Sequence, residues 1–211
     1  ERENVLLAFS HARRAPGGGT AGLTLLCGLN LWITLGDYEL WYGVALEVLA
    51  HPDAQQDDVL RSRALSPAVM IAYSTGRYDE AFVLAQSSVS IARACSDLLA
   101  LGEALHNLGT AATAIGREAD AHEHFREGLV VARKVGAAWL VAAMSNAMGE
   151  LYSQQDQLET AERHYLDALP FYGDDRVNAG LAWCNLARNA IALRAESKAV
   201  HYRRELTTMA D

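Results

Sequence analysis

The glycine-rich stretch near the N-terminus is the segment that most closely follows the spacing of a phosphate-binding loop. It runs from Gly17 to Thr24, with two glycines at the interval of such a loop and a threonine two residues later. A phosphate loop follows a strand and carries a lysine that reaches the phosphates. Leu23 occupies the lysine position, and the preceding residues have a helical pattern. We therefore interpret the stretch as a flexible connection between helices and predict no nucleotide cofactor.

His122 and His124 flank Glu123, a combination that invites a metal-site interpretation. Side chains two residues apart on a helix point about 200° away from each other. A zinc-binding helix instead places its histidines at positions i and i+4. His124 also has an equivalent in the next similar segment, His164, as a structural position in a repeat would. We predict no bound metal.

The sequence offers no recognisable nucleophile, and we predict that the chain is not an enzyme. No serine lies in a nucleophile-elbow sequence, and no cysteine and histidine have a catalytic spacing. Cys27, Cys95 and Cys184 are scattered without a CxxC pair, and we interpret them as reduced, buried cysteines. The acidic residues gather at the starts of alternate predicted helices, where negative charge complements the helix dipole.

Composition narrows the class of protein further. The 211 residues carry a formal net charge of −8, which argues against a general binder of nucleic-acid phosphates. No apolar run approaches the ~18 residues of a membrane span, so we expect no membrane contact and a cytoplasmic location. The chain begins with Glu1 in place of methionine, inside a helical pattern, so we expect it to be part of a longer protein.

A sequence repeat with a constant period sets the positions of all these side chains. Four similar turns mark it: Leu35-Gly36-Asp37-Tyr38, Thr75-Gly76-Arg77-Tyr78, Ile115-Gly116-Arg117-Glu118 and Gln155-Asp156-Gln157-Leu158. An alanine follows at 81, 121 and 161, and again, slightly early, at 199. Self-similarity at a period of about 40 residues is typical of a solenoid, whose core continues along its whole length.

Apolar residues at helical spacing predict an all-α chain of about 11 antiparallel helices. The predicted helices span residues 2–14, 21–35, 38–50, 57–74, 78–95, 97–115, 117–135, 137–154, 157–172, 175–193 and 195–210. We expect Pro67 to kink its helix or to split it after Ser66. The four tryptophans fall on apolar faces and are predicted to lie in the core: Trp32, Trp41, Trp139 and Trp183.

The helix-pair repeat resembles the tetratricopeptide repeat. The middle unit carries the likeness in Asn107-Leu108-Gly109, Gly116, Ala121, Phe125 and Leu129, and the next in Gly149, Tyr152, Ala161, Tyr165 and Leu169. The resemblance implies a right-handed α–α superhelix forming one continuous domain. We divide it into divergent helices and a degenerate repeat at 1–56, repeats at 57–96, 97–136 and 137–174, and a C-terminal repeat or cap at 175–211.

The period is longer than the usual ~34 residues of this family. It resembles the longer-helix variety found in large bacterial signalling regulators. The first ~50 residues are similar to the segment that joins a nucleotide-switch (STAND-type) ATPase to its repeat sensor. This second resemblance implies a sensor module within a larger bacterial signalling or transcriptional regulator.

In this family the first helix of each pair lines the concave groove, which implies a set of candidate ligand contacts. On our alignment they are Asn30, Arg63, Met70, Tyr73, Glu103, His106, Thr110, Thr113, Asn146, Glu150, Gln154 and Arg188. This mixed polar row suits an extended peptide, a protein partner or a small polar effector. The alternative is a self-assembly scaffold, a homo-oligomer without a groove ligand.

Overall fold

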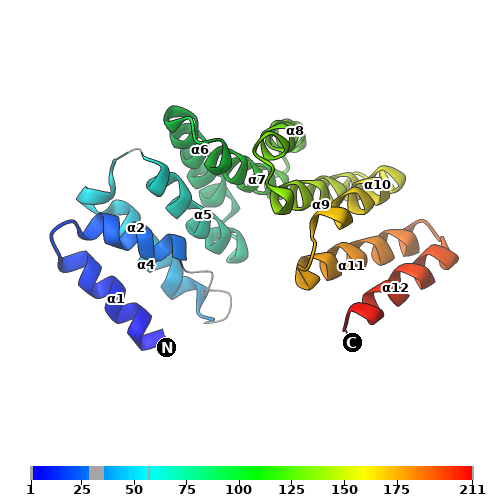
Figure 1. Ribbon diagram of the computed structural model, residues 1–211, viewed down its shortest axis with the longest axis horizontal. Helices are drawn as coiled ribbons and strands as arrows, with labels where there is room; N and C mark the ends of the chain where they lie inside the picture. Colours follow the sequence, from blue (N-terminus) through cyan, green and yellow to red (C-terminus); the bar gives the residue numbers. More distant parts are fainter. Residues whose placement is uncertain (1, 29–35, 57, 211) are drawn as a thin grey trace. The chain divides into compact units, whose positions relative to one another are not determined.

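Antiparallel helix pairs follow one another along the computed structural model, which describes residues 2–28, 36–56 and 58–210 (Figure 1). Within these residues there are eleven α-helices, two short 3₁₀ segments and no strand, so the predicted all-α class and helix number are confirmed. The chain divides into two compact units, Glu1–Arg117 (unit 1) and Glu118–Asp211 (unit 2).

With the labels of Figure 1, unit 1 contains α1 (Arg2–Arg14), α2 (Gly18–Gly28), α4 (Tyr38–Ala50), α5 (Val59–Ser74), α6 (Tyr78–Cys95) and α7 (Leu98–Ala114). A 3₁₀ turn, Pro52–Ala54, separates α4 from α5. Unit 2 contains α8 (Glu118–Val135), α9 (Ala138–Gln154), α10 (Leu158–Ala168), α11 (Arg176–Ala192) and α12 (Glu196–Ala210), with a 3₁₀ segment, Leu169–Phe171, after α10.

Aspartate side chains begin several first helices of the pairs. Asp58, Asp97 and Asp175 precede α5, α7 and α11, and each carboxylate accepts a hydrogen bond from the backbone N–H three residues later. These bonds satisfy donors that a helix start leaves without intrahelical partners. The three aspartates therefore define where these first helices begin.

The turn glycines of unit 1 adopt the left-handed conformation that ends a helix. Gly76 and Gly116 have φ angles of 76° and 75°. In each turn the next residue donates back to the helix, Arg77 N–H to the Ala72 carbonyl at 2.8 Å and Arg117 N–H to the Ala112 carbonyl at 2.9 Å. This is the bond of a Schellman cap, and it reverses the chain toward the second helix.

Small residues then bring the two helices of a pair close together. In unit 1, Ala81 and Ala85 of α6 are fully buried. Ser62 of α5 and Ser88 of α6 are also buried, and each hydroxyl donates to the other's backbone carbonyl, at 3.0 and 2.9 Å. Polar groups in a core are stabilising only when they are hydrogen-bonded in this way.

Unit 2 uses a glycine and an aromatic ring at its centre. Tyr165 of α10 is fully buried in a cluster with Ala161, Leu186 and Tyr202. Its ring lies directly against Gly149 of α9, where an added Cβ would be 2.5 Å from a ring carbon. The missing side chain at Gly149 therefore makes the space that the ring fills.

The structure differs from two sequence predictions about helix continuity. Pro67 does not split its helix, because α5 continues from Val59 to Ser74 with buried Leu65 and Ala68 on either side of the proline. Packing of a helix face can outweigh the lost backbone bond. The predicted helix at 157–172 gives way after Ala168 to a 3₁₀ segment that contains Pro170.

The Gly17–Thr24 stretch is not a flexible connection throughout. Helix α2 begins at Gly18, and both Gly18 and Gly19 are buried. A Cβ on Gly19 would lie 2.5 Å from the Ala54 backbone nitrogen. These glycines therefore allow close backbone packing and do not form an open phosphate cradle. The remainder of the predicted 21–35 helix, from residue 29 on, lies outside the described residues.

Two predictions of burial also failed in part. Trp41 is buried and Trp183 half-buried, but Trp139 is 52% exposed, and Trp32 lies outside the described residues. The three cysteines are free thiols, yet Cys27 and Cys184 are exposed and Cys95 is only partly buried. An apolar residue on a helix face need not face the core, because a solenoid helix also has a face directed away from its neighbours.

Candidate functional site

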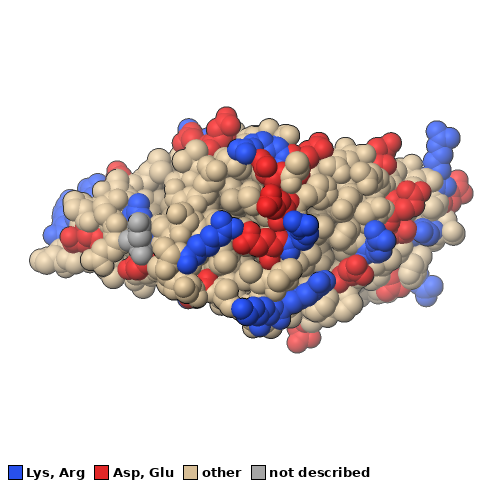
Figure 2. Space-filling model, turned by 90° about the horizontal axis from the view of Figure 1, so that it is seen from above, with Lys and Arg blue, Asp and Glu red and all other residues tan. Residues whose placement is uncertain are grey.

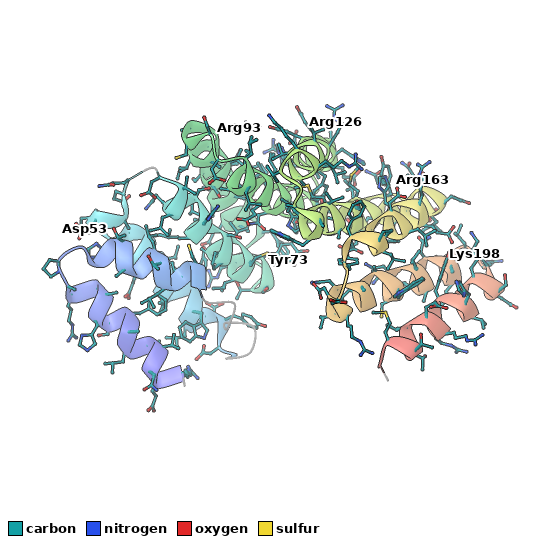
Figure 3. All side chains as sticks on the ribbon, in the orientation of Figure 1. Asp53, Tyr73, Arg93, Arg126, Arg163 and Lys198 are labelled. Atoms are coloured by element: carbon teal, nitrogen blue, oxygen red, sulfur yellow. The ribbon has the colours of Figure 1, made fainter. Side chains whose placement is uncertain are left out.

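The predicted groove residues fall on the first helices of the pairs in both units, and none of those described is fully buried. Unit 1 contributes Arg63, Met70 and Tyr73 from α5 and Glu103, His106, Thr110 and Thr113 from α7 (Tyr73 is labelled in Figure 3). Unit 2 contributes Asn146, Glu150 and Gln154 from α9 and Arg188 from α11. Asn30 lies outside the described residues.

In unit 2 the structure brings three of these residues together through a fourth. Asn185 of α11 donates from Nδ2 to Asn146 Oδ1 and to Glu150 Oε1, both at 3.1 Å. Asn146 Nδ2 also donates to Glu150 Oε1 at 3.1 Å, and Arg188 Nη2 donates to Asn185 Oδ1 at 2.8 Å. The result is a continuous polar network across α9 and α11, which we call the α9–α11 network.

Two tyrosines close to this network, Tyr165 and Tyr172, have raised pKa values. Burial raises the pKa of Tyr165 to about 12, the Glu150 carboxylate adds to the rise, and Arg188 opposes it. Burial likewise raises the pKa of Tyr172 to about 12, again with a contribution from Glu150. Both phenols are therefore neutral near pH 7. Glu150 and Arg188 are exposed and remain accessible to a ligand.

The corresponding helices of unit 1 hold their polar groups differently. The hydroxyls of Thr110 and Thr113 donate to carbonyls of their own helix, His106 O at 3.0 Å and Gly109 O at 2.9 Å. Arg63 makes a long ion pair, 3.4 Å, with Asp97. The two threonine donors are thus already used within α7.

Desolvation shifts both titratable groups on the α7 face toward their neutral forms. Desolvation lowers the pKa of His106 to about 4. It raises the pKa of Glu103, although the nearby Arg63 guanidinium opposes the rise. A neutral imidazole at neutral pH offers one hydrogen-bond donor and one acceptor.

Gln154 and Asn185 show the limits of the sequence alignment. Gln154 was predicted as a groove residue, but it lies exposed at the last residue of α9 and takes no part in the four bonds of the α9–α11 network. Asn185, which the prediction of site residues omitted, is the centre of the α9–α11 network. The equivalent asparagine two repeats earlier, Asn107, donates to Ser66 of the preceding repeat at 2.8 Å. This recurrence of asparagine is the signal that could have found it.

One of the two histidines beside Glu123, His122, lies in a cluster of aromatic rings. His122 of α8 lies 4.8 Å from the Tyr152 ring of α9, which in turn stacks on His164 of α10 at 5.1 Å and 10°. Within the part of the chain that the structure describes, no group of three or more His, Cys, Asp or Glu side chains could hold a metal ion.

Charge and hydropathy add two observations. On the face shown in Figure 2, basic and acidic side chains are interspersed, and neither sign forms a continuous patch. None of the described helices combines the length and the hydropathy that a bilayer-spanning helix requires.

Comparison with known proteins identifies the repeat. Residues 60–134 match the family model described as tetratricopeptide repeat. No curated protein sequence matches the chain. Proteins of this repeat family are generally non-catalytic scaffolds.

Solved structures that resemble the chain extend over nearly all of it. The crystal structure of BtubC (BKLC) from P. vanneervenii has a TM-score of 0.77 at 17% identity and covers 99% of this chain and 89% of its own. A putative kinesin light chain with TPR-like repeats from Podosopora anserina has a TM-score of 0.68 at 14% identity, with 93% and 97% covered. A Rap protein complexed with Competence and Sporulation Factor has a TM-score of 0.65 at 11% identity, with 99% and 71% covered.

These identities are low, so the structural likeness shows the fold alone. Residues 60–134 match the tetratricopeptide-repeat family model, and the chain as a whole has the fold of a TPR-like helical solenoid.

Proposed function

We propose that this chain is a non-catalytic interaction module that binds a peptide or protein partner through the polar face of its first helices. The observation that supports the proposal best is the α9–α11 network. Its asparagine amides, carboxylate and guanidinium offer both donors and acceptors on one face. A peptide backbone presents the complementary groups at regular intervals.

The network is also held in place before a ligand arrives. Its bonds of 2.8 to 3.1 Å restrict the side chains of Asn146, Glu150 and Arg188. Restriction in the free state lowers the entropy lost on binding. One solved structure with this fold is a Rap protein complexed with Competence and Sporulation Factor, which supports a bound partner as the role of the fold.

We extend the proposal to the predicted groove residues of unit 1. Arg63, Glu103 and His106 would give unit 1 its own set of polar contacts with a bound partner. Because His106 is neutral at neutral pH, it would contribute hydrogen bonds and no charge.

Selection of peptides on the folded chain tests the proposal. A random peptide library displayed on phage is panned against the full chain, and the enriched peptides are titrated by fluorescence anisotropy. We expect Asn146→Ala combined with Arg188→Ala to weaken binding at least tenfold, because each lost charged or amide bond is worth about 1 kcal/mol or more. The control is Arg163→Ala, an exposed arginine on α10 (Figure 3). Equal binding to the double variant and the wild type would refute the proposal.

We also propose that the module is a cytoplasmic sensor within a larger bacterial signalling or transcriptional regulator, of the long-repeat kind joined to a STAND-type ATPase. The likeness of the first ~50 residues to the segment between such an ATPase and its repeats supports it. Ligand binding would then act by favouring one conformational state of the regulator over another. The reading frame upstream of Glu1 in the parent gene provides the test, since an unrelated neighbour in place of a nucleotide-binding domain would contradict it.

A further inference from the structure

A pocket of about 120 Å³ lies between α1, α2 and α4 in unit 1. Side chains of α1 and α4 line it, together with the first turns of α2. Most of the lining is apolar, and its larger apolar side chains are Leu6, Phe9, Val44 and Val48. None of its described lining residues belongs to the predicted groove, so the pocket is separate from the polar face of the proposed function.

The glycines of α2 leave this space unfilled. Helix α2 begins with Gly18 and Gly19, whereas α5 begins with Val59 and Leu60. A Cβ on Gly18 would clash with the Ala12 carbonyl oxygen of α1, so this position accepts no side chain. Among the described lining residues, α2 contributes glycines alone. Helix α2 therefore packs closely on α1 without adding a side chain to the pocket.

Two contacts between α1 and α4 restrict the width of the pocket. Phe9 of α1 and Trp41 of α4 are 5% and 3% exposed, and their ring centroids lie 6.4 Å apart. Arg13 Nη1 donates to Glu47 Oε2 at 2.8 Å, which links the same two helices a second time. A ligand would therefore enter a pocket whose sides are already in place, as most small-molecule sites are.

The charges of the pocket cancel each other. Among its described lining residues, Arg13 and Glu47 alone carry a permanent charge, and they pair with each other. A charged ligand would lose hydration without meeting an unpaired opposite charge. Ser10 and His51 add polar groups to the lining. Because His51 Nδ1 accepts a hydrogen bond from Asp53 N–H at 3.2 Å, the ring proton lies on Nε2, which can donate.

We propose that this pocket binds a small uncharged molecule about the size of one six-membered ring, with a single hydrogen-bonding group. An apolar cavity of about 150 Å³ in a protein takes up benzene, and this pocket has a similar volume. Apolar walls with a few polar groups are the usual construction of a small-molecule site. The proposal does not depend on the proposed function, because the two sites use different residues.

Titration with phenol, followed by NMR of the leucine and valine methyl groups, tests the proposal on the whole chain. Phenol is uncharged near pH 7, and benzoate is its charged counterpart. We expect saturable shifts of the Leu6, Val44 and Val48 methyl signals with a Kd of about 1 mM or below for phenol. Benzoate should bind at least about tenfold more weakly. Equal affinity for the two compounds, or no saturation by about 10 mM phenol, would overturn the proposal.

Matched tryptophan variants locate the site. Leu6→Trp and Val44→Trp enlarge lining side chains on α1 and α4, whereas Leu7→Trp and Leu46→Trp add the same ring on these helices where the side chains are 57% and 39% exposed. We expect the lining variants to bind phenol at least about tenfold more weakly, because the added ring occupies the pocket, and the exposed variants to bind it like the wild type. Circular dichroism checks that each variant folds, and either folded lining variant is sufficient. Lining variants that bind phenol as tightly as their exposed counterparts would refute this location.

Discussion

Unit 1 forms its repeat turns with Gly76 and Gly116, whereas unit 2 forms the equivalent turns with Asp156 and Arg194. All four residues have positive φ angles, from 55° to 76°. In unit 2, as in unit 1, the next residue donates back to the helix, Gln157 N–H to Tyr152 O and Ala195 N–H to Ala190 O, both at 2.9 Å. The backbone conformation is therefore required, while glycine is only the residue that adopts it with least strain.

The interiors of the two units differ in their polar chemistry. Unit 1 buries neutral serines between α5 and α6. Unit 2 nearly buries a carboxylate, Glu162 at 8% exposure, which accepts bonds from Lys198 Nζ and the Tyr202 hydroxyl, both at 2.7 Å (Lys198 is labelled in Figure 3). What the units share is the left-handed turn and the alanine five residues after it. The remaining positions are free to vary, and the candidate ligand contacts lie among them.

The largest expected effect comes from adding a methyl group to the glycine–tyrosine contact of unit 2. Gly149→Ala places a Cβ 2.5 Å from the fully buried ring of Tyr165. Overpacking of this kind should destabilise unit 2 by about 3 kcal/mol in urea unfolding. The control is Gly43→Ala in α4, where a Cβ meets nothing within 4 Å and helix propensity should add up to about 1 kcal/mol. Wild-type stability of Gly149→Ala would contradict the prediction that the contact between Gly149 and Tyr165 limits the packing of unit 2.

Acid should destabilise unit 1 through His106. Its folded-state pKa of about 4 lies below the ordinary value of 6.5, so the folded state favours the neutral ring. The stability from this shift is complete above pH 6.5 and is lost as the pH falls toward 4.

Urea unfolding near neutral pH and near pH 4.5 should therefore show that the wild type loses about 2 kcal/mol more than His106→Gln on acidification. His164→Gln in unit 2 is the comparison, because desolvation lowers the pKa of His164 in the same direction. A larger effect of His164→Gln than of His106→Gln would reverse the assignment of acid sensitivity to unit 1.

Removing one partner of the Glu162 carboxylate tests the polar interior of unit 2. Tyr202→Phe deletes the hydroxyl that donates to Glu162 at 2.7 Å. We expect a loss of about 1.5 kcal/mol, because a nearly buried charge loses a hydrogen bond. Desolvation acts to raise the pKa of Glu162, but Lys198 and Tyr202 together hold it below its usual value, so the folded state favours the charged carboxylate and acid destabilises the wild type. Tyr202→Phe removes part of this lowering, so the variant should lose less stability than the wild type as the pH falls. Urea unfolding measures both effects. Tyr78→Phe, at an exposed tyrosine of unit 1, is the control, and its free energy of unfolding should equal that of the wild type.

The smallest effect should come from exchanging turn residues between the units. Arg194→Gly relieves the cost of a left-handed conformation at an exposed arginine, partly offset by the greater chain entropy of glycine. We expect a net gain of about 0.5 kcal/mol, and a loss of about 1 kcal/mol for the reverse change Gly76→Ala. Differential scanning calorimetry measures both, and a gain from Gly76→Ala would contradict the shared-conformation interpretation.

Several features could be read from the sequence because they depend on nearby residues. The regular spacing of Gly36, Gly76 and Gly116 predicted where helices end, since a left-handed cap needs only the residues around it. The spacing of Ala81, Ala121 and Ala161 predicted the close helix pairs. Both signals act within one turn or one pair of helices, and neither requires knowledge of distant contacts.

Other features depended on packing between elements. Asn185 joins the α9–α11 network only because α9 and α11 lie side by side, a relation between residues 35 and 39 positions apart. Pro67 remains within a helix because its neighbours are buried against other helices. Local propensity cannot anticipate either result.

The amino-acid sequence by itself determined the helical class, the number of helices and the repeated turn, because each follows from backbone preferences and apolar spacing over a few residues. The tertiary structure decided which apolar faces are covered. Trp139 of α9, together with Val177, Leu181, Cys184 and Ile191 of α11, lies at the helical spacing of core residues, yet all five side chains are exposed. A helical pattern specifies which residues share a face, whereas only the placement of neighbouring helices decides whether that face is buried or left for a partner.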